Sequence, residues 1–184
     1  MGTKKESKVG TSSKKSHINL KRFLVTYILL MGSFFLLIGL TPIQRIVDLN
    51  GLYTKGVVFL TTEVLNLVDI ASIRDGSIIH LPGISLDIRF GCNGLEAVLI
   101  YTVSVIAFPS SWRNRLYGIF LGFLVIQIVN ILRIVGLAYT GIHFREFFEY
   151  IHIYVAQGMM IAVSLGVFFL YLSWINEEKR SEKA

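Results

Sequence analysis

Apolar residues form four long runs that are separated by short polar segments. The runs extend over residues 23–40, 94–112, 116–139 and 150–175. Each run has 18 residues or more, and about 20 apolar residues in helical form cross the hydrocarbon core of a bilayer. The pattern therefore predicts an all-α polytopic membrane protein with about four transmembrane helices.

A fifth segment, residues 52–70, is apolar in part but short and carries several charges. If it crossed the membrane, Cys92 would lie in the cytoplasm and the basic residues Arg113 and Arg115 outside. Lys and Arg favour cytoplasmic loops, so that topology is disfavoured. We therefore predict an amphipathic helix along the outer leaflet, which can also dip into it. A distorted fifth span remains the alternative.

The stretch before Cys92 has the pattern of β-structure. Pro82-Gly83 is a turn signal, and Ile84, Leu86 and Ile88 alternate with polar residues. Within residues 77–90 this alternation predicts a short β-hairpin on the outer face that leads directly to Cys92.

Composition and charge agree with the membrane class. The 184 residues are 53% hydrophobic, and the mean hydropathy of +0.62 is too high for a soluble globule of this size. The single cysteine excludes an internal disulfide framework and a multi-cysteine metal site. Of the net charge of +6, much comes from a Lys-rich start. A nucleic-acid-binding arm is conceivable, but a basic flank before an apolar run marks the cytoplasmic side. No nucleic-acid partner is expected, whereas the lipid bilayer is.

These features define the domain organisation. Residues 1–20 are predicted to be a mobile basic cytoplasmic tail, 21–176 one membrane-embedded domain, and 177–184 a charged cytoplasmic tail. Thr41-Pro42-Ile43 offers no small-x-small cleavage site, so the first run is read as an uncleaved anchor. With four spans, both termini and the Arg113/Arg115 loop lie in the cytoplasm.

Three polar residues on different helices are predicted at one depth. Cys92 lies 21 residues before Arg113, which is about 31 Å along a helix. Arg133 lies 18 residues after Arg115, or about 27 Å. His152 lies 24 residues before Asn176, or about 36 Å. Because the hydrocarbon core is about 30 Å thick, all three arrive near the outer membrane boundary.

The three residue types suit nucleophilic acyl chemistry. Cys92 lies at the start of a helix, whose dipole should lower the pKa of the thiol. A cysteine nucleophile needs a base, and His152 suits that role, with His80 and His143 as rivals on the same face. Arg133 can stabilise a thiolate, an oxyanion or a substrate carbonyl. Each residue also has a plain reading: an inert buried cysteine, a snorkelling arginine and an interfacial histidine.

Supporting positions surround these three residues. Asn130 and Gln127 continue a polar ridge below Arg133 and should face the bundle. The backbone N–H groups of Asn93 and Gly94 are candidates for an oxyanion hole. Glu96 could pair with Arg133, either in catalysis or as a structural ion pair. No metal or nucleotide motif is present, so no cofactor is expected.

Glycines predict where helices approach closely. Gly118 and Gly122 form a Gly-x-x-x-Gly pattern, and Gly158 lies in the last apolar run. Each permits close helix packing in a membrane.

Cys92-Asn93-Gly94 opening a helix, Asn130-Ile131-Leu132-Arg133 about forty residues later and His152 near the last helix resemble the exosortase/archaeosortase family. The resemblance covers roughly residues 20–175. Many members carry Ser where this chain has Asn93, and typical bacterial members are longer. The compact size resembles exosortase H.

The resemblance implies an activity. Members are membrane cysteine peptidases or transpeptidases of the bacterial inner membrane, and their targets are exported proteins that end in a short motif, a transmembrane helix and a basic tail. It implies catalytic roles for Cys92, Arg133 and His152 in a site that faces the periplasm or exterior. The rival class is a non-enzymatic assembly factor or transporter subunit with a buried pair of Arg133 and Glu96.

Overall fold

The computed structural model describes residues 20–39, 49–146, 148–150, 152, 154 and 157–181. Nearly all of the predicted N-terminal tail and the Thr41-Pro42-Ile43 segment lie outside the described residues. The helices are α1 (Leu20–Gly39), α3 (Leu49–Leu67), α4 (Leu95–Ala107), α5 (Trp112–His143), α6 (Phe148–Tyr150) and α7 (Gln157–Ser181). The strands are β1 (Ile73–Asp75), β2 (Ile78–Leu81) and β3 (Ile84–Asp87).

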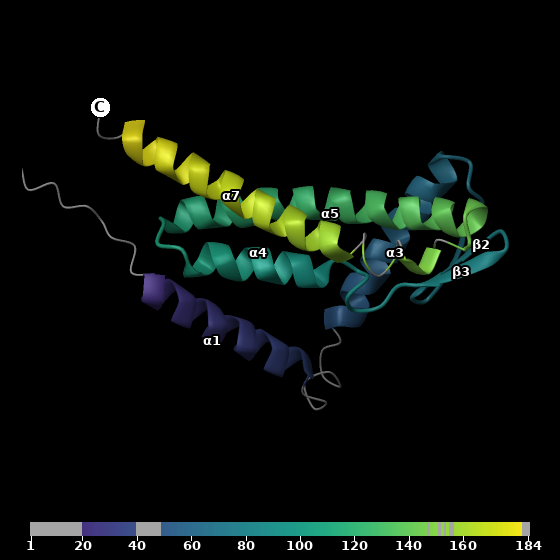
Figure 1. Cartoon of the computed structure of the whole chain (residues 1–184), viewed down its shortest axis with the longest axis horizontal. Helices are drawn as coiled ribbons and strands as arrows, with labels where there is room; N and C mark the ends of the chain where they lie inside the picture. Colours follow the sequence, from purple (N-terminus) through teal and green to yellow (C-terminus); the bar gives the residue numbers. More distant parts are fainter. Residues whose placement is uncertain are drawn as a thin grey trace, which may run out of the picture.

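The molecule has two lobes that share the long helix α5 (Figure 1). In the helical lobe, α4 and α7 pack along the first part of α5, and α1 packs on α4. In the mixed lobe, α3 and the β-sheet pack on the last part of α5. Each lobe has its own apolar core. The helical core comprises Ala97, Tyr101, Val105, Phe108, Ile126, Met160, Tyr171 and Ile175. The mixed core comprises Val57, Val58, Leu65, Ile79, Leu81, Leu86, Ile88, Ile134 and Ala138.

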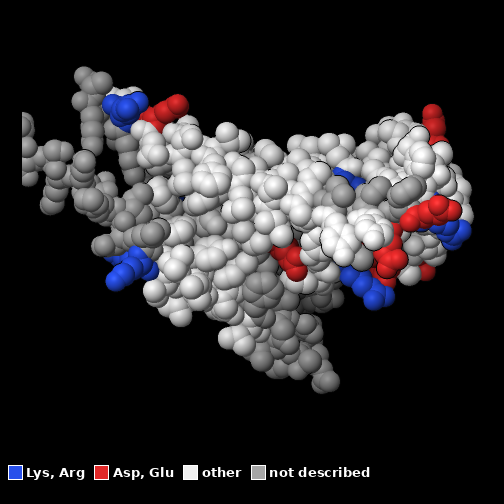
Figure 2. Space-filling view, viewed as in Figure 1, with Lys and Arg blue, Asp and Glu red and all other residues white. Residues whose placement is uncertain are grey.

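The helical lobe has the surface of a membrane protein. Two helices, Trp112–His143 and Gln157–Glu178, are long and apolar enough to cross a bilayer. Large apolar side chains are exposed along α5 from Leu116 to Leu132, which a soluble protein would bury. Charged side chains gather at the two ends of the visible face, and a broad band over the helical lobe is largely free of them (Figure 2).

The junction of α4 and α5 differs from the prediction. Helix α4 ends at Ala107, earlier than expected, because Pro109 has no N–H and disfavours helical backbone in the residue before it. The side chain of Ser111 then caps α5 by accepting a hydrogen bond from the Asn114 N–H at 3.3 Å. Arg113 and Arg115 therefore lie in the first turn of α5 and not in a loop.

The other predicted boundaries also shift. Helix α7 begins at Gln157, seven residues after the predicted start of its apolar run at 150. It continues to Ser181, so most of the predicted tail 177–184 is helical. Helix α3 begins three residues before the predicted amphipathic segment 52–70, and it packs on the sheet and on α5.

The sheet has three antiparallel strands in the order β1-β2-β3. Strands β2 and β3 are joined by Pro82-Gly83, and Leu81 lies opposite Ile84. Gly83 has a φ of 82°, which glycine adopts freely. Strand β1 precedes the predicted hairpin and was not predicted; it is exposed along its length.

Two of the three glycines expected to permit close packing do so. A Cβ atom at Gly122 would lie 2.1 Å from the Tyr101 ring, and one at Gly118 would lie 2.5 Å from the Tyr171 ring. The Tyr101 hydroxyl donates a hydrogen bond to the Gly118 carbonyl at 2.6 Å. A Cβ atom at Gly158 would meet nothing within 4 Å, so that part of the prediction is wrong.

Candidate active site

Cys92 lies on the turn that joins the mixed lobe to α4, between the two apolar cores. The Arg89 carbonyl accepts hydrogen bonds from the N–H groups of Cys92 at 2.8 Å and Asn93 at 2.9 Å. Gly94 is the N-cap of α4, with a φ of 81°. A Cβ atom at Gly94 would lie 2.6 Å from the side-chain amide carbon of Asn130. Both the backbone angle and the lack of space require glycine there.

The side chain of Asn93 attaches this turn to α3. Asn93 is fully buried. Its Nδ2 donates hydrogen bonds to Asn50 Oδ1 and Thr54 Oγ1, each at 2.9 Å. Its Oδ1 accepts a hydrogen bond from the Leu95 N–H at 3.1 Å. These three bonds fix the residue next to Cys92 from the mixed-lobe side.

Helix α5 holds the turn from the opposite side. Asn130 Nδ2 donates a hydrogen bond to the Asn93 carbonyl at 2.7 Å. The Arg133 guanidinium donates one to the Cys92 carbonyl through Nη2. Both side chains are buried, as the polar ridge predicted. Arg133 Nε and Asn130 Oδ1 are buried with no hydrogen-bond partner among the described residues.

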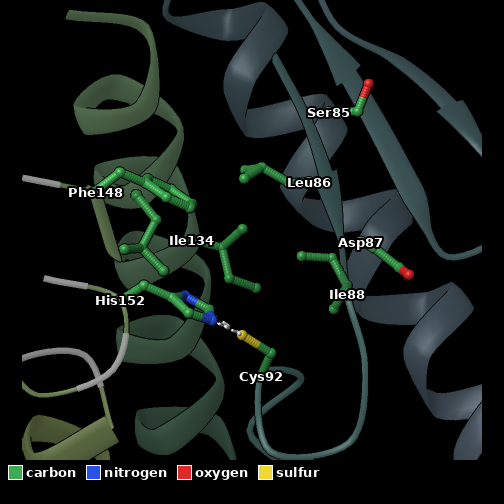
Figure 3. Close-up of a pocket in the computed structure, with 9 residues that line it drawn as sticks. Ser85, Leu86, Asp87, Ile88, Cys92, Ile134, Phe148 and His152 are labelled. Carbon is green, nitrogen blue, oxygen red and sulfur yellow. Dashed lines mark hydrogen bonds between the residues drawn. The ribbon is translucent and has the colours of Figure 1, made fainter. Parts of the chain in front are cut away.

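The imidazole of His152 lies beside the thiol (Figure 3). The Cys92 Sγ atom is 3.6 Å from His152 Nε2 and 3.8 Å from Nδ1. The Phe148 ring stacks on the imidazole, with ring centroids 5.7 Å apart and planes 9° apart. His152 was predicted to open the last helix but lies in a π-helical turn five residues before α7. Such turns are frequent at functional sites.

The rival histidines lie elsewhere. His80 is exposed and forms a 2.9 Å hydrogen bond through Nδ1 with Ser85 Oγ. His143 is hydrogen bonded to the Tyr139 carbonyl at 3.1 Å and stacks on that residue's ring. Of the three candidate bases, the structure therefore brings His152 to the thiol.

The protonation of the pair differs from the sequence-based expectation. Burial raises the pKa of the Cys92 thiol, and the Arg133 charge opposes this effect only in part. Burial also lowers the pKa of His152, and the Arg133 charge lowers it further. The prediction of a lowered thiol pKa is therefore wrong, because loss of solvent outweighs the nearby positive charge. The resting pair is a neutral thiol beside a neutral imidazole.

The predicted oxyanion donors also change. The Asn93 N–H is already bonded to the Arg89 carbonyl, so it is not available to a substrate. No partner within the described part of the chain is recorded for the Gly94 N–H. Together with Arg133, it remains a candidate donor to a developing negative oxygen. A thiol, a base and a fixed cation at one point can support nucleophilic attack on a carbonyl.

Glu96 does not pair with Arg133. The two salt bridges between described residues join Arg74 to Glu63 and Arg89 to Asp87. Glu96 and Arg133 instead line one cavity of about 210 Å³ between α1, α4 and α7. The rival hypothesis of a scaffold held by a buried pair of these residues therefore loses the contact on which it depended.

Several residues that build the site were not predicted from the sequence. Phe148 positions the imidazole, and Asn50 and Thr54 anchor the turn through Asn93. Spacing in the sequence could have indicated both pairs of side chains. Phe148 lies four residues before His152, and Asn50 lies four residues before Thr54. On a helix this spacing places two side chains on one face.

Comparison with known proteins gave one match. A family model described as transmembrane exosortase (Exosortase_EpsH) matches residues 21–173. Comparisons with curated proteins and with solved structures each gave no match. The matched range contains the thiol, the guanidinium and the imidazole described above.

Proposed function

Because the chain belongs to the transmembrane exosortase family, we propose that it is a membrane cysteine peptidase or transpeptidase. Its substrates are exported proteins that end in a short motif, a transmembrane helix and a basic tail. The observation that carries the proposal is the meeting of Cys92 Sγ with the His152 imidazole at 3.6 Å. The Arg133 guanidinium, bonded to the Cys92 carbonyl, completes the group.

The first half-reaction forms an acyl-enzyme. As Cys92 Sγ attacks the substrate carbonyl, His152 accepts the thiol proton, so that the nucleophile becomes a thiolate only at the moment of attack. The Arg133 guanidinium and the Gly94 N–H stabilise the negative oxygen of the tetrahedral intermediate. The carbon–nitrogen bond then breaks, and the leaving amine takes its proton from the His152 imidazolium. A thioester to Cys92 remains.

The second half-reaction releases the product. An amine or a water molecule attacks the thioester, and neutral His152 accepts a proton from it. The carbon–sulfur bond breaks, and the thiolate of Cys92 is protonated by the imidazolium. Attack by an amine gives transpeptidation, and attack by water gives hydrolysis.

The site would lie at the outer boundary of the bacterial inner membrane. The start of α1, the α4–α5 junction and the end of α7 lie at one end of the molecule (Figure 1). Basic residues are present at each of these points, which marks the cytoplasmic side. Helices α1, α4, α5 and α7 then form the four crossings, and α3 and the sheet lie outside.

The nucleophile is tested by Cys92→Ala and Cys92→Ser. We expect each variant to leave uncut precursors, because neither side chain supplies a thiolate. The measurement is mass spectrometry of the membrane fraction, which identifies proteins that retain their C-terminal helix and basic tail only in the variant cells. Normal processing by either variant would remove the nucleophile assignment.

Histidine variants provide a matched comparison. We expect His152→Ala to lower processing of the precursors identified above by about 100-fold or more, which is the usual contribution of a general base. His80→Ala and His143→Ala remove imidazoles from the same lobe and should keep near-normal processing. Loss of activity in His80→Ala or His143→Ala alone would assign the base to that residue.

Arg133→Lys tests the guanidinium. An ammonium cannot both donate to the Cys92 carbonyl and reach an oxyanion with the same geometry. We expect processing to fall severely, by about 100-fold, a loss typical of removing one oxyanion donor. Near-normal turnover, measured on the same precursor, would reduce Arg133 to a structural role.

A further inference from the structure

Strand β3 is an edge of the sheet, and half of its backbone groups face away from β2. The Ile88 N–H donates to the Ser77 carbonyl at 2.9 Å. In an antiparallel pair hydrogen-bonded positions alternate, so Leu86 also bonds across to β2. The N–H and C=O groups of Ser85 and Asp87 must therefore point to the open side. Such an unpaired edge can accept another strand.

This open edge borders a cavity that contains the thiol. The cavity has a volume of about 130 Å³. Figure 3 shows the side chains of Ser85 and Asp87 pointing away from it. Since both residues nevertheless line it, they do so with backbone atoms.

The opposite wall of the cavity is apolar and ends at the catalytic pair. It is formed by Ile134 and Leu137 of α5 and by Phe148 of α6. Figure 3 shows His152 below Ile134 and Phe148. Backbone groups on one side and apolar side chains on the other suit an extended peptide. The cavity can take one aliphatic side chain from such a peptide.

We propose that the substrate segment before the scissile bond binds as an added β-strand on the free edge of β3, between this edge and α5. The proposal rests on the proposed function, because it needs Cys92 to be the nucleophile. The peptide backbone pairs with Ser85 and Asp87, and one aliphatic side chain of the peptide enters the cavity. Strand addition of this kind gives affinity through the main chain and selectivity through alternate side chains.

The course of the chain sets the direction of the added strand. Strand β3 runs from the Pro82-Gly83 turn at the far end of the mixed lobe toward Cys92 and the helical lobe. A substrate whose membrane helix follows the scissile bond also runs from the outside toward the membrane. The added strand is therefore parallel to β3.

Peptide probes test the pairing on the wild-type protein. The probe is acetylated tetraleucine that ends in a vinyl sulfone, to which Cys92 adds by forming a carbon–sulfur bond while the α-carbon takes a proton. Four further probes each carry one N-methyl group, at successive amides. In a strand, alternate amides face the same neighbour. We expect methylation at alternate positions to lower the rate of Cys92 labelling about three- to tenfold, as loss of one backbone hydrogen bond does.

A second measurement uses proline variants on the two edges of the sheet. Ser85→Pro removes an N–H from the open edge of β3 without breaking a backbone hydrogen bond to β2. It also removes the exposed hydrogen bond between Ser85 Oγ and His80, so Ser85→Ala, which loses this bond but keeps the N–H, is measured beside it. Arg74→Pro is the matched control, because Arg74 lies opposite Ile79 and its N–H faces away from β2 on the other edge. We expect Ser85→Pro to slow labelling by the unmethylated probe about three- to tenfold and Arg74→Pro to leave it unchanged. Alkylation by iodoacetamide should be the same in both.

The outcomes separate the two proposals. Equal effects of all four methyl groups, or none, would overturn strand addition and leave the nucleophile intact. Failure of the peptide probe on a protein whose Cys92 reacts with iodoacetamide would do the same. Normal precursor processing by Cys92→Ala would instead overturn the proposed function, whatever the peptides show.

Discussion

Burial and two neighbouring side chains act on the proton of the Cys92 thiol in different ways. Burial favours the neutral thiol, the Arg133 charge favours the thiolate, and His152 can accept the proton. Since the net effect on the pKa of the thiol is upward, the thiolate is not stored before substrate arrives. The pair resembles a general-base arrangement more than a preformed ion pair.

This arrangement predicts that alkylation and processing rise with pH in two different ranges. Alkylation of Cys92 by iodoacetamide should be slow at pH 7 and should rise only in the alkaline range, because the pKa of the thiol is raised. Processing should persist at pH 7 and fall as acid protonates His152, at a pH below 6.5 because its pKa is lowered. The measurements are alkylation rates and turnover of one precursor in buffered membranes. A plateau of rapid alkylation at pH 6 would contradict both pKa directions.

The positions of these groups could be predicted better than their protonation. Counting helical rise from Arg113, Arg115 and Asn176 predicted that Cys92, Arg133 and His152 lie near one another. The three groups do meet, although α4 ends at Ala107 and His152 precedes α7, so two of the counted intervals are not continuous helix. The pKa of the thiol could not be obtained in this way. It depends on side chains distant in the sequence that exclude water from the sulfur.

At the scale of the elements, α4 and α5 are held together by contact between a glycine and an aromatic ring. Gly122 faces the Tyr101 ring, whose hydroxyl reaches Gly118 one turn away. Lipid tails are as apolar as the surface of a membrane helix, so burying that surface against another helix gives little hydrophobic free energy. Close packing of this kind therefore supplies much of the attraction between membrane helices.

The effect of a glycine-to-alanine substitution on stability should therefore depend on whether the glycine of α5 faces another helix. Gly122→Ala places a Cβ atom 2.1 Å from the Tyr101 ring, and such overpacking typically costs about 1–3 kcal/mol. Gly136→Ala is the matched control on the same helix, because its Cβ atom meets nothing within 4 Å and alanine is the better helix former. We expect thermal unfolding in detergent to show a lower Tm for Gly122→Ala and an unchanged or higher Tm for Gly136→Ala. Equal shifts would contradict close packing at Gly122.

The type of the long elements could be predicted better than their extent. Apolar runs located the long helices, because a helix that faces lipid is apolar over its whole length in the sequence. The break between α4 and α5 depends on Pro109 and the cap at Ser111, which an apolar count does not include. Strand β1 is exposed on every residue and therefore lacks the alternation that indicated β2 and β3.

At the scale of the whole molecule, the two apolar cores meet at the turn that carries Cys92. The helical core is surrounded by exposed apolar side chains, which suit a bilayer, and the mixed core is built in part from the small sheet. Bonds from α3 and from α5 both end on Asn93. The residue next to the nucleophile is therefore fixed both by α3 and by the helix that the two lobes share.

The proposed orientation can be tested with the only cysteine removed. In a Cys92→Ala background, Asp75→Cys lies in the mixed lobe, and Ser181→Cys lies at the opposite end of the molecule. Both positions are exposed. We expect a membrane-impermeant maleimide to label Asp75→Cys in intact spheroplasts and Ser181→Cys only after permeabilisation. The reverse pattern would place the site in the cytoplasm.

Helix α5 passes from one lobe to the other without interruption over 32 residues. At about 1.5 Å per residue it is about 48 Å long, well beyond the hydrocarbon thickness of about 30 Å. In a peptidase of the proposed kind, this helix would hold Cys92 at a constant height above the membrane, because Arg133 of α5 is hydrogen bonded to the Cys92 carbonyl. The enzyme would then measure how far a target's cleavable bond stands above the target's own membrane anchor. A spacer of a few residues between the motif and the target's membrane helix adds about 3.3 Å per residue when extended. Such a spacer would move an unchanged motif beyond the reach of Cys92.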